Sequence, residues 1–429
     1  MSSHARSFSI SRKASKNGPS TAIVLVGGPS RGTRFRPLSL DAPKPLFPIA
    51  GKPIIWHHLE ALSKVKSVKE VLLIGFYEEH VFRNFIREAE AAFGGFNVKY
   101  LREYQSLGTA GGLYLFRDAI LKSQPNNIIV MHADICCSFP LQEMLAMHEE
   151  KQAVATILGT RVAADVATNF GCIVQDSATS EVLHYVEKPE SQISNMISCG
   201  VYIFDESVFS AIKDVMQVRE EEKSANLDPL HESDDRLRLE QDILTPLSQT
   251  KKMFVFETKD FWRQIKTAGS AVPANALYLT KAEQANPGGQ KPSQQCELQL
   301  PVYIHPTATV DTSAKLGPGV SIGANVKIGA GVRIKDAIVL DNVDVKAHAC
   351  ILHSIIGTDS RVGAWARVEG TPTASGQHNT TVLKNGVKVQ SITVVANNVV
   401  VGDEIRLQNC IVLPQKELKG RNYTSEVIM

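Results

Sequence analysis

A glycine-rich stretch follows the apolar run at residues 22–26 and carries the first residues suited to chemistry. Its glycines and the residues beside them are Gly27, Gly28, Gly32, Thr33 and Arg34. Glycines let backbone N–H groups approach phosphate oxygens, and an arginine offers a fork of donors to the same oxygens. The stretch therefore predicts a loop that binds the phosphates of a nucleotide or nucleotide sugar.

Two further charged residues stand where a phosphate ligand could meet them. Lys44 lies between Pro43 and Pro45, whose rings restrict the backbone around it. Asp134 closely follows the apolar run at residues 128–132, and ligands of open α/β sheets lie at the carboxyl ends of strands. Taken alone, Arg34 is more typical of a solvated surface, and Asp134 of a loop or a helix cap. In this order, at strand ends, they favour a ligand site.

Apolar runs and helical patterns alternate along the first two-thirds of the chain. We expect strands at residues 22–26, 71–75, 98–101, 128–132 and 153–158, and helices at residues 54–63 and 81–92. Such alternation predicts an α/β, Rossmann-like domain with a mostly parallel sheet over residues 21–285. Residues 219–238 are charged and predict an exposed loop or a disordered insertion. Residues 1–20, basic and rich in serine, predict a disordered tail in preference to a transit peptide.

A period of six residues marks the last third of the chain. Aliphatic residues recur at 304, 310, 316, 322, 328, 334 and 340, then at 345, 351, 356, 362 and 368, and finally at 395, 401, 407 and 413. This spacing predicts a left-handed parallel β-helix of hexapeptide repeats over residues 301–429. Residues 286–300 predict a linker. Residues 371–390 break the period and predict an insertion, either a contact loop or a tolerated surface loop.

Composition limits the classes of binding partner and the cellular compartment that we expect for the protein. The formal charge of +2 demands neither nucleic acid nor an anionic membrane. The seven cysteines lack the paired spacing of a zinc site and predict reduced thiols. No apolar run approaches the ~20 residues that cross a bilayer, so we expect a cytoplasmic protein.

The glycine-rich stretch and Lys44 belong to a longer pattern that resembles sugar-phosphate nucleotidyltransferases, and most closely the mannose-1-phosphate guanylyltransferases. The matching residues there are Gly27, Gly28, Gly32, Thr33, Arg34, Pro37, Leu38, Pro43, Lys44, Pro45, Gly51, Lys52 and Pro53. Further matches are Leu107, Gly108, Thr109, Ala110, Gly111, Asp134, Gly171, Glu187, Lys188 and Pro189. With the hexad repeats, the resemblance spans residues 21–429.

The resemblance implies a reaction in which mannose 1-phosphate attacks GTP and yields GDP-mannose and pyrophosphate. It implies that Arg34 and Lys44 hold the triphosphate, Asp134 binds Mg²⁺ and Lys188 meets the sugar phosphate. By the same template Gly108, Thr109, Ala110 and Gly111 face guanine, and Gly171, Glu187 and the position of Ser198 face mannose. Such a transfer depends on positioning and on neutralising charge.

Three departures from the family pattern bear on activity. Pro29, Ser30 and Arg31 separate Gly28 from Gly32, where the pattern has one residue. Gln264 stands where active relatives place a second metal-binding aspartate, and an amide is a weaker Mg²⁺ ligand. Ser198 replaces the usual asparagine near the sugar, a milder change because a hydroxyl still hydrogen-bonds.

These departures resemble the alpha, or regulatory, class of the family. The resemblance implies a catalytically weak or inactive subunit that needs no metal, binds GDP-mannose and assembles with a catalytic beta subunit, in homo- and hetero-oligomers. Residues 371–390 would then touch the partner. The alternative is an active guanylyltransferase with Mg²⁺. A third reading, a coenzyme A-dependent acyltransferase using His305, His348 or His353, has no other feature in its favour.

Overall fold

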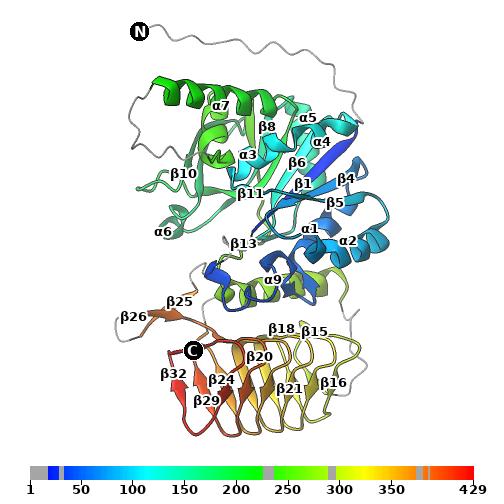
Figure 1. The fold of residues 1–429 in the computed structure, drawn as a ribbon, viewed down its shortest axis with the longest axis vertical. Coiled ribbons are helices and arrows are strands. Elements are labelled where there is room, and N and C mark those ends of the chain that lie inside the picture. Colours follow the sequence, from blue (N-terminus) through cyan, green and yellow to red (C-terminus); the bar gives the residue numbers. More distant parts are fainter. Residues whose placement is uncertain (1–17, 29–32, 226–235, 288–295, 373–379, 385–386) are drawn as a thin grey trace.

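The structure is a computed structural model that describes residues 18–28, 33–225, 236–287, 296–372, 380–384 and 387–429 (Figure 1). Most of the expected tail, and Pro29, Ser30, Arg31 and Gly32 of the glycine-rich stretch, lie outside these residues. Within the described chain, an α/β domain is followed by a stack of short parallel strands, with helix α9 between them (Figure 1).

A nine-stranded sheet forms the centre of the first domain. Its strands are β1 (Ser20–Gly27), β4 (Val68–Gly75), β5 (Asn97–Arg102), β6 (Asn127–His132), β8 (Ala155–Arg161), β9 (Gly171–Gln175), β10 (Val182–Glu187), β11 (Met196–Phe204) and β12 (Met253–Glu257). The main path runs β10-β9-β11-β6-β1-β4-β5, while β8 pairs with β11 and β12. Strands β6, β1, β4 and β5 are parallel, and β11 enters antiparallel. The expected α/β class with a mostly parallel sheet is confirmed.

Helices cover both faces of this sheet because its central strands are apolar on both sides. In β1, Val24 packs with residues of α1, α2 and α5, whereas Ile23 packs with residues of α3 and α7. The helices of this domain are α1 (Ile54–Ser63), α2 (His80–Phe93), α3 (Gly108–Leu115), α4 (Arg117–Ile120), α5 (Leu141–Lys151), α6 (Ala164–Ala167), α7 (Val208–Ala225), α8 (Thr245–Ser248) and α9 (Ala271–Ala285).

The prediction of a loop at residues 219–238 was wrong for its first part. Helix α7 continues to Ala225, and a π-helical turn, η4 (Leu239–Leu244), follows the segment. Buried Val208, Phe209 and Ile212 anchor the first turns of α7. Its charged end then extends the helix because glutamate, lysine and alanine are good helix formers, even without an apolar face.

Short elements shape the edge of the sheet that faces α9. The 3₁₀ turns η1 (Thr33–Phe35) and η2 (Lys44–Leu46) and the ribbon of β2 (Pro48–Ile49) with β3 (Lys52–Pro53) follow β1. A second ribbon pairs β7 (Ile135–Cys137) with β13 (Trp262–Gln264) in antiparallel register. The remaining 3₁₀ turns are η3 (Leu121–Ser123) and η5 (Ala268–Ser270).

The C-terminal domain is a stack of parallel strands, as expected for a β-helix. The strands are β14 (Glu297–Leu298), β15 (Val302–Ile304), β16 (Thr309–Val310), β17 (Lys315–Leu316), β18 (Val320–Ile322), β19 (Lys327–Ile328), β20 (Arg333–Val339), β21 (Asp344–Val345), β22 (Cys350–Ile356), β23 (Arg361–Val362), β24 (Arg367–Glu369), β27 (Thr393–Val395), β28 (Val400–Val401), β29 (Arg406–Gln408), β30 (Ile411–Val412), β31 (Glu417–Leu418), β32 (Tyr423–Thr424) and β33 (Val427–Ile428). Strand β14 already pairs with β17, inside the range expected as a linker.

The inward positions of the coils follow the hexads. Ile334 pairs with Ile351, and Ile351 pairs with Val368, so aliphatic side chains stack from coil to coil in a buried core. Two expected positions are one residue late. Val339, not Leu340, lies in the coil core and pairs with Ile322 and Ile356, whereas Leu340 packs in the cluster with α9. Val412, not Leu413, is buried and pairs with Val395. In both places the step from the preceding inward residue, Ile334 or Leu407, is five residues long, so a strict period of six places the next position one residue late.

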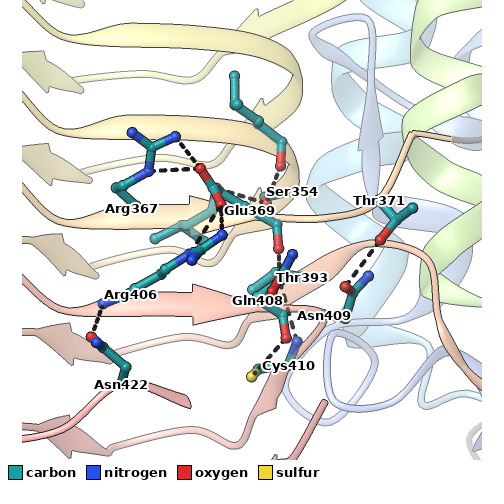
Figure 2. A network of polar contacts seen from close by, with 12 residues as sticks. Ser354, Arg367, Glu369, Thr371, Thr393, Arg406, Gln408, Asn409, Cys410 and Asn422 are labelled. Carbon is teal, nitrogen blue, oxygen red and sulfur yellow. Dashed lines mark hydrogen bonds and ion pairs between the residues drawn. The ribbon is translucent and has the colours of Figure 1, made fainter. Parts of the chain in front are cut away.

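The insertion at residues 371–390 leaves the stack after β24 and contains a hairpin of β25 (Thr381–Lys384) and β26 (Val387–Gln390). Its two ends meet at the buried Asn409 (Figure 2). The amide oxygen of Asn409 accepts from the Thr371 hydroxyl at 3.0 Å, and its nitrogen donates to the carbonyl oxygen of Ser391 at 2.8 Å. The insertion therefore begins and ends at a fixed point.

The two domains share one apolar cluster. Ile49 and Ile265 of the first domain pack in it with residues of α9 and with Ile338 and Ile355 of the coils. Buried Asn275 of α9 adds polar contacts: its oxygen accepts from the backbone N–H of Ala50 at 2.8 Å and from the hydroxyl of Ser321 at 2.6 Å. Packing of this kind joins the coils to the edge of the sheet.

Candidate functional site

A cleft opens at the carboxyl ends of the central strands, where the sequence predicted a ligand site. Residues that line it are Arg34, Lys44, His132, Asp134, Ile135, Asn169, Phe170, Gly171, Tyr185, Glu187, Lys188, Ser198, Cys199, Gly200, Tyr202, Glu240, Trp262, Gln264 and Lys266. Thus Arg34, Lys44, Asp134, Gly171, Glu187, Lys188 and Ser198, all predicted from sequence, meet in one place. Gly27 ends β1 and Gly28 follows it, just before residues 29–32, which the structure does not describe.

Asp134 lines the cleft and is held by two neighbours. The Lys44 ammonium donates to Oδ2 at 3.0 Å, and it also donates to the carbonyl oxygen of Ile265 at 3.2 Å. The Gln264 amide nitrogen lies 3.3 and 3.4 Å from the two carboxylate oxygens. Because a carboxylate only accepts hydrogen bonds, this amide presents its NH₂ group. Both oxygens of Asp134 therefore already have protein donors.

The β7–β13 ribbon explains why Gln264 meets Asp134. Gln264 pairs with Ile135 across the ribbon, and the backbone N–H of Ile265 donates to the carbonyl oxygen of Asp134 at 2.8 Å. Gln264 and Lys266 line the cleft while Ile265, between them, is buried in the interdomain cluster. The alternation follows from extended backbone, in which successive side chains point to opposite sides.

Charge in the cleft shifts the titration of Asp134. Burial raises the pKa of this carboxyl, but the positive charge of Lys44 and of His132 outweighs burial and lowers the pKa to about 2. The hydrogen bond from Lys44 acts in the same direction. Asp134 is therefore an anion at every pH at which the protein would work.

A second group of residues lies where β9 begins and β10 ends. Glu187 forms an ion pair of 3.0 Å with Lys188 and accepts a hydrogen bond from the Tyr185 hydroxyl at 3.2 Å. A Cβ added at Gly171 would lie 2.1 Å from that hydroxyl and 2.8 Å from a Glu187 oxygen, so only glycine fits there. A carboxylate, a hydroxyl and an ammonium group in one place could bind the hydroxyls and phosphate of a sugar phosphate.

Sequence reasoning missed a polar chain that links this region to α3. The Ser198 hydroxyl donates to the Tyr202 hydroxyl at 3.2 Å, and Tyr202 donates to Glu240 at 3.4 Å. Glu240 also accepts from the Thr109 hydroxyl at 3.2 Å and lies 2.9 Å from Nε2 of His132. The one available signal was His132 at the end of a strand, two residues before Asp134. Glu240 gave none, because it follows a charged stretch that favours a loop.

The pKa of His132 reflects this contact. Burial lowers it, but the hydrogen bond and charge of Glu240 raise it further than burial lowers it, so the net shift is upward. The same pair lowers the pKa of Glu240 against the effect of its burial. His132 and Glu240 therefore form an ion pair at one wall of the cleft whenever the imidazole is protonated.

The segment predicted to face guanine forms the first turn of α3, where free amides can bind anions or polar groups. Two of these amides are engaged: the N–H groups of Ala110 and Gly111 donate to the carbonyl oxygen of Leu237 at 3.0 and 3.3 Å. Gly108, at φ +83°, lies so close to Leu237 that an added Cβ would meet its carbonyl oxygen at 2.2 Å. Thr109 connects the turn to the cleft through Glu240.

Lys266 was also missed, although it stands only two residues after Gln264. Its ammonium lies 4.6 Å from the ring centre of Phe170. Burial lowers the pKa of Lys266 below its ordinary value, Asp134 opposes this shift, and the nearby cations add to it. Together with Arg34, Lys44 and Lys188, it gives the cleft four cationic side chains.

The donor set around Asp134 does not fit Mg²⁺, the ion that the resemblance implies. Mg²⁺ takes oxygen ligands in octahedral geometry, usually from one or two carboxylates. Here the oxygens of Asp134 face an ammonium group and an amide NH₂ group. In the described part of the chain, no group of three histidine, cysteine, aspartate or glutamate side chains could hold a metal ion.

The three histidines of the coils have separate, local contacts. His305 hydrogen-bonds Thr307 at 2.9 Å, His348 stacks on Trp365 at 4.3 Å between ring centres, and His353 lies 3.5 Å from Asp336. None of the helices in the described residues is long and apolar enough to cross a membrane.

Comparison with known proteins agrees with this arrangement. The Nucleotidyl transferase family model matches residues 21–265, and the GMPPB C-terminal domain model matches residues 298–428. A Schizosaccharomyces pombe protein named "Probable mannose-1-phosphate guanyltransferase" is 54% identical over 96% of this chain and 100% of its own length. Two proteins named mannose-1-phosphate guanylyltransferase regulatory subunit, alpha from Dictyostelium discoideum and alpha-B from Danio rerio, are 46% and 44% identical, each over 95% of this chain and 98% and 99% of their own lengths. With its site residues in one cleft and full-length relatives of this kind, the chain belongs to the nucleotidyl transferase family, among the mannose-1-phosphate guanylyltransferases.

Proposed function

We propose that this chain binds GDP-mannose in the cleft around Asp134 and regulates a paired catalytic guanylyltransferase subunit, rather than transferring the nucleotide itself. The observation that carries the proposal is the contact of Gln264 with both oxygens of Asp134. A transferring site would have to give up this contact to collect ligands for a metal ion. Relatives of nearly full length that are named regulatory subunits support the same conclusion.

The cleft keeps the means to bind a nucleotide sugar while its means of transfer are weakened. Arg34 and Lys188 line it as exposed cations, and Glu187 with Gly171 offers a place for sugar hydroxyls. Lys44, by contrast, is engaged by Asp134 at 3.0 Å. Transfer requires groups that stabilise developing charge at positions correct to about 1 Å, whereas binding tolerates looser placement.

The root of the insertion touches the segment that carries Gln264, which supports a regulatory role for residues 371–390. The hydroxyls of Thr267 and Thr380 lie 3.1 Å apart, and Thr380 directly precedes the hairpin strand β25. Thr267 is three residues from Gln264. A ligand that shifts this segment would move Thr267, and with it the base of the insertion at Thr380. We propose that the insertion in turn contacts the catalytic domain of the partner in a hetero-oligomer.

The second candidate is an active guanylyltransferase, favoured by the name of the relative that is 54% identical. It would use Arg34, Lys44 and Lys188 on GTP and mannose 1-phosphate with Mg²⁺. Pyrophosphate release by the purified chain, supplied with these three reagents, separates the two. We expect almost no release, and robust turnover would establish the second candidate instead.

Regulation is tested on the complex with its catalytic partner. Turnover is measured against GDP-mannose concentration with the full chain, with residues 371–390 deleted, and with Thr380→Val. We expect the deletion to abolish the response to GDP-mannose and Thr380→Val to weaken it, because that variant removes one hydroxyl contact. Ser313→Ala, on the exposed side of the coils, is the matched control. An unchanged response in the deleted form would refute the role of the insertion.

A further inference from the structure

The charges in the cleft do not all pair with one another. Lys44 pairs with Asp134, Lys188 with Glu187 and His132 with Glu240, at 3.0, 3.0 and 2.9 Å. Among the residues that the structure describes, the ammonium group of Lys266 forms no ion pair or hydrogen bond, and it lies over the face of the Phe170 ring. The cleft therefore holds a cation beyond those its own carboxylates engage.

The position of Lys266 is fixed, which distinguishes it from a mobile surface lysine. It is half-buried, and the preceding Ile265 is fully buried in the interdomain cluster and hydrogen-bonded to Asp134 through its backbone. The contact with Phe170 restrains the side chain over one wall of the cleft. A half-buried ammonium without an anionic partner costs free energy in the empty protein. Binding sites typically carry such a cost, and a bound ligand of opposite charge removes it.

We propose that Lys266 binds the diphosphate of the ligand directly and supplies the positive charge that a divalent cation would otherwise bring, so that the cleft binds a nucleoside diphosphate sugar without metal. The identity of that ligand as GDP-mannose rests on the function proposed above. The inference that the cleft binds a diphosphate without metal does not rest on that function.

The chemistry of the neighbouring groups favours this assignment. The two phosphates of a nucleotide sugar carry one negative charge each, and an ammonium group has three donors for their oxygens. Asp134, which would hold a metal ion, is already neutralised by Lys44 and capped by Gln264. Lys266 and Gln264 are two residues apart on extended backbone, and both line the cleft. The amide that stands at a metal-ligand position and the unpaired ammonium group therefore lie on the same side of this segment.

The test is calorimetric titration of GDP-mannose into the full chain, once with EDTA and once with millimolar Mg²⁺. We expect affinities that agree within twofold in the two buffers. Lys266→Ala should weaken binding by about 10- to 100-fold, the usual loss for a hydrogen bond to a charged group, and Lys266→Arg should restore much of it. Lys213→Ala, an exposed lysine of α7, is the control and should change nothing.

Inorganic pyrophosphate, titrated in EDTA, separates this inference from the proposed function. Binding of pyrophosphate but not of GDP-mannose, lost in Lys266→Ala, would uphold the role of Lys266 and overturn the proposed ligand. Binding of GDP-mannose at equal affinity in wild type and Lys266→Ala would overturn the role of Lys266 alone. An affinity at least tenfold higher with Mg²⁺ would overturn metal independence, and binding of neither probe would overturn both proposals.

Discussion

Two carboxylates, Asp134 in the cleft and Glu369 in the coils, are each held by basic or amide donors, yet their surroundings differ. The side chain of Glu369 is 10% exposed. It accepts from Arg367 on one oxygen, with Nε at 2.7 Å, and from Arg406 on the other at 3.1 Å (Figure 2). Both cations near Glu369 are therefore engaged. Near Asp134, Lys44 is engaged and Lys266 is not.

The difference separates a structural ion network from a ligand site. A network that supports a fold satisfies its own charges, because an unpaired charge lowers stability. The Glu369 network also joins successive coils next to the root of the insertion: the Thr393 hydroxyl donates to the Glu369 carbonyl oxygen (Figure 2). A binding site keeps a surplus of one sign, and the ligand completes the pairing.

The largest effect on stability should come from Glu369→Ala. It leaves two arginines without their shared partner, so we expect the free energy of unfolding to fall by about 2 to 3 kcal/mol, reduced from the buried-pair range because both arginines are half exposed. Urea denaturation measures this loss, and GDP-mannose affinity should stay within twofold. Glu417→Ala, which removes an exposed pair with Lys419 in the same domain, should cost almost nothing. Equal losses in the two variants would remove the distinction.

Asp134 should show an intermediate effect that depends on pH. Its pKa is lowered from 3.8 to about 2, so its contribution is complete above pH ~4 and is lost as the pH falls through ~2. The contribution corresponds to about 2 kcal/mol. Asp134→Asn should therefore lower the unfolding free energy at pH 6 and approach the wild type as the pH falls below 3. A difference between the two proteins that does not change with pH would contradict the stabilising role of Lys44.

The smallest effect should come from Lys266→Met. Because Lys266 has no ion-pair partner among the described residues, its removal breaks no pair and relieves a small desolvation cost. We therefore expect the unfolding free energy of the ligand-free chain to rise, by less than about 0.5 kcal/mol. Arg406→Met should lower it by about 1 kcal/mol, since Glu369 loses one of two partners. If Lys266→Met proved the more damaging, Lys266 would be a structural residue and the comparison would fail.

The sequence predicted best where a pattern repeats or a strand ends. Six-residue spacing indicated the coils, the end of an apolar strand indicated Asp134, and the family resemblance indicated Glu187. Glu240 could not be predicted, because its contact with His132 joins distant segments, and η4 follows a charged stretch without periodicity. Lys266 could not be predicted for another reason. Its ammonium group lacks a partner because Lys44 and Gln264 already contact Asp134, and such contacts depend on distances in the folded chain.

Ile265 has a mechanical consequence. Its side chain is clamped between α9 and the coils, while the peptide on either side of it carries Gln264 and Lys266 into the cleft. A movement of the coils relative to the sheet would therefore act through Ile265 on the two cleft residues next to it in the chain. The segment from Gln264 to Lys266 thus joins the interdomain packing directly to the cleft, and a force on the coils would reach the cleft through a single residue, Ile265.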